Sequence, residues 1–104
     1  MLEWIILGLL FGGAVLAVAI TVTEVIRRSN IGDIIKRHML NSTDEAVRKA
    51  LGKTIKAKIK SKDVNVVSLD AICMDTGEVI EYTITSDSGV DSSITAGTEV
   101  IFNA

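Results

Sequence analysis

Residues 4–23 read WIILGLLFGGAVLAVAITVT and contain no charged side chain. About 20 consecutive apolar residues are enough to cross a hydrocarbon layer of about 30 Å as a helix. The threonines at the end of the stretch can return their hydroxyls to carbonyls of the preceding turn. The stretch therefore predicts a single transmembrane helix, with residues 1–26 as the anchor.

The basic residues after this stretch predict its orientation. Lysine and arginine favour the cytoplasmic side of a membrane, whereas tryptophan suits the headgroup zone. We therefore expect the N-terminus outside and the C-terminal part in the cytoplasm. A cleaved signal peptide is the alternative, but Glu3 stands where such a peptide carries positive charge. The residues expected at the membrane interface are Trp4, Arg27, Arg28, Lys36 and Arg37.

Small residues recur four positions apart within the predicted span. Gly8 and Gly12 form one such pair, and Gly13 and Ala17 form a second. Small residues at this spacing share one helix face and let two helices approach closely. They predict a helix–helix contact, although glycine is also common in membrane helices that make none. Whether the partner is another copy or a different protein stays open.

Charge is divided sharply along the chain. All eleven Lys and Arg residues lie within residues 27–62, whereas residues 63–104 contain eight acidic residues and no base. The formal net charge of −2 therefore hides a basic segment followed by an acidic one. We expect the basic segment to lie against anionic lipid and the acidic segment to stand away from it.

Residues 27–52 carry a helical pattern in two pieces. Ile31, Ile34, Ile35 and Leu40 are spaced for one apolar helix face. Ser42 and Glu45 match a capping box, which predicts a second helix over residues 43–51. We expect two short amphipathic helices, the first of which either lies on the membrane or packs against the domain that follows.

From residue 53 the pattern changes to that of strands. Residues 54–60 alternate strictly between apolar and lysine side chains, and residues 64–74 and 78–85 flank an Asp-Thr-Gly turn. Residues 99–102 form a last short run. The expected fold class is a single transmembrane helix plus a small α+β cytoplasmic region. In that region short amphipathic helices precede a four- to five-stranded antiparallel β-barrel-like domain at residues 53–104.

A span followed by a small β-barrel superficially resembles the arrangement in NfeD-type membrane proteins with an OB-like domain. The shared element is a strand-turn-strand ending over residues 94–100. Many β-barrels contain such an ending, so no family is assigned.

A row of lysines is the sharpest surface feature. Lys56, Lys58, Lys60 and Lys62 share one parity and predict a ridge on one face of a strand. The ridge is a possible binding surface for anionic headgroups or an acidic partner. Lysines also protect exposed edge strands or pair with acids across a sheet. Nucleic acid is not expected, because no aromatic stacking platform accompanies the lysines.

No constellation of catalytic, cofactor-binding or metal-binding residues is visible. Cys73 shares the parity of apolar neighbours, which predicts a buried thiol. The only histidine, His38, follows two bases and is expected in solvent. Asp87 and Asp91 lie in a loop too short for a calcium-binding EF-hand. We therefore expect no catalytic residue, no cofactor and no metal, and the chain is not expected to be an enzyme.

These observations favour a membrane-anchored, cytoplasm-facing interaction or assembly subunit. Its expected partners are membrane lipid and either further copies of itself or a larger membrane complex. One alternative is a membrane-active small protein, toxin or holin-like, whose transmembrane helix is the active part. Another is an OB-like accessory of a membrane enzyme complex. The sequence does not identify the biological process, the partner or the oligomeric state.

Overall fold

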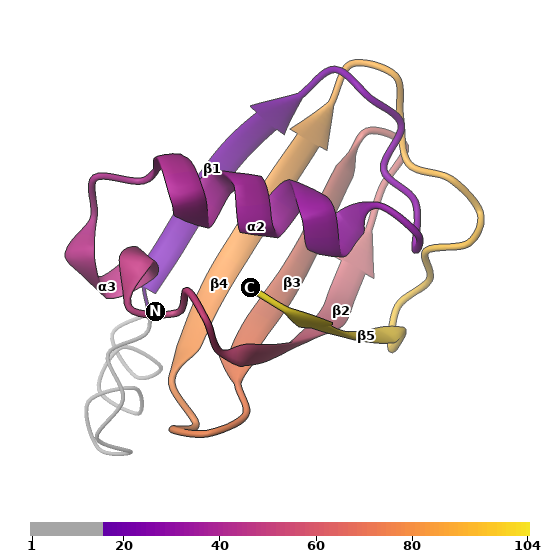
Figure 1. Cartoon of the computed structure of the whole chain (residues 1–104). Helices are drawn as coiled ribbons and strands as arrows, with labels where there is room; N and C mark the ends of the chain where they lie inside the picture. Colours follow the sequence, from indigo (N-terminus) through magenta and orange to yellow (C-terminus); the bar gives the residue numbers. More distant parts are fainter. Residues whose placement is uncertain (1–15) are drawn as a thin grey trace, which may run out of the picture.

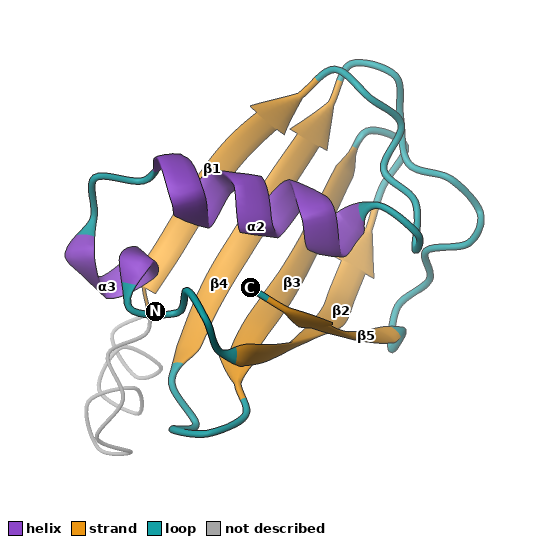
Figure 2. Ribbon diagram, in the orientation of Figure 1, coloured by secondary structure: helices purple, strands orange, loops and turns teal. Residues whose placement is uncertain are grey.

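Five strands form one sheet in the order β1-β4-β3-β2-β5, and helix α2 lies across one face of it (Figures 1 and 2). The computed structural model describes residues 16–104. Strands β2, β3 and β4 form an antiparallel meander, β5 adds antiparallel to β2, and β1 adds parallel to β4. The elements are β1 Leu16–Val22, α2 Ile31–Asn41, α3 Glu45–Arg48, β2 Thr54–Lys62, β3 Val66–Cys73, β4 Val79–Ser86 and β5 Glu99–Asn103.

The predicted membrane span is wrong at its C-terminal end, where the chain forms strand β1. Leu16 pairs with Ile80 and Val22 pairs with Ser86. The backbone groups of β1 therefore form hydrogen bonds with β4 and not the hydrogen bonds of a helix. Within residues 16–104 no helix is long and apolar enough to cross a membrane. The prediction of a single-pass membrane protein with its N-terminus outside is thereby overturned.

The expected fold class is also corrected, because the sheet is open and not barrel-like. Strands β1 and β5 stand at opposite edges of the sheet and do not pair with each other. A strand from the stretch predicted as a span is part of the same sheet as the later strands. The alternation in residues 54–104 correctly located four strands, but the chain contributes the fifth from before the helices.

The core lies between α2 and one face of the sheet. Ile31, Ile35 and Met39 of α2 are fully buried in one cluster with Leu69 and Tyr82 of the sheet. Leu40, which the sequence placed on the apolar face, is 57% exposed. The buried residues follow the spacing i, i+4 and i+8, so Met39 occupies the position predicted for Leu40.

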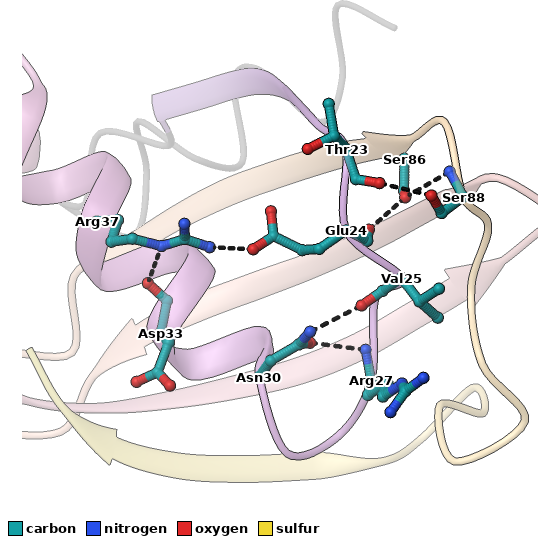
Figure 3. Close-up of polar contacts among 9 residues, drawn as sticks. All are labelled: Thr23, Glu24, Val25, Arg27, Asn30, Asp33, Arg37, Ser86 and Ser88. Atoms are coloured by element: carbon teal, nitrogen blue, oxygen red, sulfur yellow. Dashed lines mark hydrogen bonds and ion pairs between the residues drawn. The ribbon is translucent and has the colours of Figure 1, made fainter.

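Side chains from β4, from the loop after it and from α2 hold the segment that follows β1 (Figure 3). The buried hydroxyl of Ser86 donates to the carbonyl of Glu24, and the hydroxyl of Ser88 donates to the carbonyl of Thr23 at 2.6 Å. The carboxylate of Glu24 also pairs with the guanidinium of Arg37 at 2.6 Å. Three different segments are therefore joined at the point where the chain leaves the sheet.

Different side chains hold the N-terminal ends of the two helices. Asn30 precedes α2, but its side chain bonds back to the amide of Arg27 and the carbonyl of Val25, both at 2.7 Å. Helix α3 is only four residues long, and the carboxylate of Asp44 caps it by accepting from the amide of Ala46. The predicted Ser–Glu capping box does not form, because Asp44 supplies the acceptor that caps α3.

Candidate functional site

Strand β1 has an outer edge with which no other strand in residues 16–104 pairs. Its side chains alternate between half-buried and exposed along all seven residues. Leu16, Val18, Ile20 and Val22 face the helix-covered side, whereas Ala17, Ala19 and Thr21 point to the open face. Such an edge presents a row of backbone donors and acceptors to a further strand.

The apolar core does not end cleanly at this edge. On the neighbouring strand β4, Tyr82 and Ile84 are completely buried. Their partners on β1, Val18 and Ile20, are only half-buried, because no strand within residues 16–104 lies on the outer side of β1. The core therefore continues to the edge of the sheet and is left incomplete there.

A shallow groove lies between β1 and α2. Its volume is about 310 Å³, and it is lined by Ile20, Thr21, Val22, Ile34, Arg37, His38 and Asn41. Ile20, Val22 and Ile34 are its apolar lining, and the polar residues are Thr21 of β1 and Arg37, His38 and Asn41 of α2. This groove and the outer edge of β1 together form what we call the β1 edge site.

The sequence of β1 contains none of the features that discourage strand pairing. Natural edge strands are often blunted by lysine, by proline, by a bulge or by charged side chains that point inward. β1 has seven uncharged residues and no proline, and it pairs with β4 without a register shift. At the other edge, Glu99 of β5 places a charge on the open face.

The lysine row lies on the open face of the sheet, but β2 is not an edge strand. It is paired with β3 on one side and β5 on the other, so edge protection does not explain its lysines. Lys60 Nζ lies 3.2 Å from Asp70 and 2.6 Å from Glu81, and Lys56 lies 4.0 Å from Glu99. Cross-strand pairing therefore accounts for two of the lysines.

Lys62 does not belong to the row. A register shift between Ile59 and Ser61 places Ser61 opposite Ser68 and Lys62 opposite the buried Val67. The Lys62 ammonium instead donates to the carbonyl of Asp91 at 2.9 Å. The bulge thus removes one lysine from the predicted ridge, which a pattern of strict alternation does not reveal.

Burial and hydrogen bonding shift the pKa of Lys60 in opposite directions. Burial lowers it, while the hydrogen bonds to Glu81 and Asp70 and the charges of both carboxylates raise it, and the net pKa is raised. The basic and acidic segments of the sequence thus meet on one face of the sheet. This reduces the charge that the lysine row can offer to an outside partner.

His38 is not solvated as predicted. Its Nδ1 lies 3.1 Å from the hydroxyl of Tyr82, and the two rings meet edge to face. Burial lowers the pKa of His38 and raises that of Tyr82. Sequence reasoning missed this pair because the two residues are 44 positions apart.

The other predicted site residues are not brought together. Arg27 and Arg28 are exposed in the turn before α2, and Lys36 and Arg37 are exposed on α2. Ala17 lies on a strand, so it has no helical contact to make there. Trp4, Gly8, Gly12 and Gly13 lie outside the described residues.

Cys73 is buried at the end of β3, as its parity predicted. Across residues 16–104, no group of three or more His, Cys, Asp or Glu side chains is placed to hold a metal ion. The chain matches no family model, no curated protein and no solved structure. The feature that can indicate a function is therefore the geometry of the β1 edge site.

Proposed function

We propose that this protein is an assembly module whose two copies join through the β1 edge site. The observation that carries the proposal is the uncharged strand β1, whose outer edge pairs with no other strand of residues 16–104 and whose apolar side chains are half-buried. A strand added there completes both the backbone ladder and the apolar layer beneath α2. Strand addition of this kind gains affinity from main-chain hydrogen bonds.

Strand β1 is suited to pair with itself. A two-fold axis at Ala19 sets Ala17 opposite Thr21 of the partner and Val18 opposite Ile20 of the partner. Facing residues then point to the same side of the joined sheet, because the side-chain period of a strand is two. Small side chains meet on the open face, and branched apolar side chains meet beneath the helices.

Symmetry and size also support a second copy as the occupant. Most soluble homo-oligomers have closed symmetry, and a two-fold dimer uses the same patch on both subunits. A chain of 104 residues buries a smaller share of its surface than a larger domain, so it gains from further burial. Covering the half-exposed side chains of β1 adds about 25 cal/mol per Å² of apolar area removed from water.

The test measures the molecular mass in solution of the full wild-type chain and of a variant with a charged residue on strand β1. The wild-type chain is expected at twice its 11.1 kDa mass, and Ala19→Lys at the single mass. Ala19 is exposed on the open face, so a lysine fits the folded monomer while opposing its own copy across the two-fold axis. Ile101→Lys makes the same kind of change on β5 and is expected to leave the dimer intact. A wild-type chain that stays monomeric at high concentration contradicts the proposal.

A further inference from the structure

A second concave site lies at the other end of the sheet, between α3 and the β3–β4 hairpin. It is a pocket of about 150 Å³ with a buried floor that includes Ile55, Ala71 and Ile80. Helix α3 lies beside the start of β1, and the segment after it passes across this end of the sheet on the same side as α2 (Figure 1). The walls and rim include Ala46, Lys49, Ala50, Lys53, Cys73 and Glu78. We call this cavity the α3 pocket.

The pocket exists because small side chains line it from both sides. Ala46 and Ala50 come from α3 and the turn after it, and Ala71 and Cys73 come from β3. None of these side chains reaches far into the space between the two layers. An apolar cavity of about 150 Å³ is large enough to hold a benzene-sized group.

Backbone hydrogen bonds fix the walls of the pocket. The amide of Lys53 donates to the carbonyl of Ala50 at 3.2 Å, and the carbonyl of Lys53 accepts from the amide of Ala104 at 2.9 Å. On the opposite side, the amide of Cys73 donates to the carbonyl of Glu78 at 2.8 Å. The cavity is therefore bounded by backbone held on both sides.

The rim of the pocket carries a net positive charge. Among residues 16–104, Lys49 and Lys53 line it together with a single acid, Glu78. Within the described part of the chain none of these three side chains forms an ion pair within 4.0 Å. Two ammonium groups beside a small apolar cavity match a ligand with an apolar body and an anionic end.

We propose that the α3 pocket binds a small carboxylate with a phenyl or short alkyl body. The apolar body lies between Ala50 and Ala71, and the carboxylate meets the ammonium groups of Lys49 and Lys53 at the rim. The pocket is too small for a drug-sized molecule, since such sites measure about 300–1,000 Å³. A neutral ligand of the same shape lacks the interaction at the rim.

Cys73 supplies a local reporter of occupancy. It is the only cysteine of the chain, and it is 6% exposed in the wall of the pocket. Burial raises the pKa of its thiol, but hydrogen bonds from the Thr76 hydroxyl and the amides of Thr76 and Asp75 lower it by more, so the net pKa is lowered. A ligand in the pocket covers this thiol and slows its alkylation.

The experiment titrates the full chain with phenylacetate and with 2-phenylethanol as the neutral counterpart. Binding is followed by calorimetry and by the rate at which iodoacetamide alkylates Cys73. Phenylacetate is expected to saturate and to slow alkylation, with 2-phenylethanol binding more weakly. Lys53→Gln is expected to weaken phenylacetate binding by about two- to fivefold, as loss of one exposed charge interaction predicts. Lys58→Gln on the open face is the matched control and leaves binding unchanged.

Two further variants locate the ligand. Ala50→Leu fills the cavity and is expected to abolish both binding and protection of Cys73. Ala46 is exposed at the mouth, so Ala46→Leu narrows the entrance without disturbing the core and is expected to lower affinity. Absence of saturable phenylacetate binding overturns the proposal, and so does unchanged binding by folded Ala50→Leu.

Discussion

His38 of α2 and Tyr82 of β4 are joined beneath the helix, with 3.1 Å between the Nδ1 atom and the phenolic oxygen. Tyr82 is completely buried, and His38 is half-buried in the wall of the groove of the β1 edge site. A buried hydroxyl without a partner is costly. This bond therefore fixes α2 over the part of the sheet that borders the β1 edge site.

Removing the tyrosine hydroxyl is expected to lower stability modestly. Tyr82→Phe keeps the ring in the core but takes away the one side-chain hydrogen bond that its hydroxyl makes within residues 16–104. We expect the free energy of unfolding to fall by about 1 kcal/mol, the usual net worth of such a bond. Urea unfolding measures this loss. A variant as stable as wild type shows that the bond contributes nothing net.

His38 is expected to make stability depend on pH. Burial lowers its pKa below the ordinary value of 6.5, so the unfolded chain binds a proton at higher pH than the folded chain does. Stability contributed by the neutral histidine is thus lost as pH falls below 6.5 and levels off below the folded pKa. Urea unfolding at about pH 7.5 and about pH 5.5 measures the loss. His38→Gln should reduce it, and an unchanged loss in that variant contradicts this role.

Lys60 is expected to matter more for stability than its neighbour Lys58. Asp70 and Glu81 pair directly across β3 and β4, so Lys60→Gln leaves two carboxylates facing each other. We expect a loss of about 0.5–1 kcal/mol, smaller at high salt, because these side chains are partly exposed. Lys58 forms no ion pair within 4.0 Å among the described residues, and Lys58→Gln is expected to change stability by less than about 0.5 kcal/mol. Equal losses from both variants contradict the pairing.

Gly32 lets α2 approach β5 closely. A Cβ atom added there meets the ring of Phe102 at 3.0 Å. Replacing glycine within a helix gains up to about 1 kcal/mol of helix propensity, the value for alanine. Any side chain at this position, however, pushes the ring of Phe102 away. We expect Gly32→Val to destabilise the chain by about 1–3 kcal/mol through overpacking. Phe102→Leu should relieve part of that loss in the double variant, and strict additivity would show that the two residues do not interact.

Local patterns predicted the later strands because each of these strands carries its own alternation or is bounded by its own turn residues. The alternation that starts at Thr54 and the Asp-Thr-Gly turn before β4 locate the meander within a few residues. At the turn, Gly77 has a positive φ of 76°, a conformation that glycine adopts without strain. In these segments, periodicity and turn chemistry indicate the same structure.

Strand β1 was mispredicted because two patterns overlap in it. Residues 16–22 read LAVAITV, which continues the uncharged run of a span but also alternates large and small side chains. That alternation is typical of a strand. The segment forms a strand because it pairs with β4, which lies more than 50 residues later in the sequence. A length criterion alone favours the helix.

The sites depend on contacts that no local pattern contains. The α3 pocket combines Ala50 with Ala71, which come from separate segments and meet only in the fold. The unfinished core at β1 follows from strand order, because Val18 would be covered if β1 were central. Sequence periodicity indicates which side of a strand is apolar, but not which strand stands at the edge.

The most direct test of the β1 pairing is a cross-link between two copies at Ala19. The proposed two-fold axis sets this residue opposite itself, with Cα atoms about 4.5–5.5 Å apart as in any antiparallel pair. That separation lies within the range of about 4.4–6.8 Å that a disulfide spans.

Ala19→Cys in a Cys73→Ala background should therefore give a covalent dimer on mild oxidation. Ile101→Cys in the same background places an exposed thiol on the β5 edge and is expected to stay monomeric. The proposed pairing predicts rapid formation of a covalent dimer by the Ala19→Cys variant and none by the Ile101→Cys variant. Equal yields from both edges, or no dimer from Ala19→Cys, would contradict it.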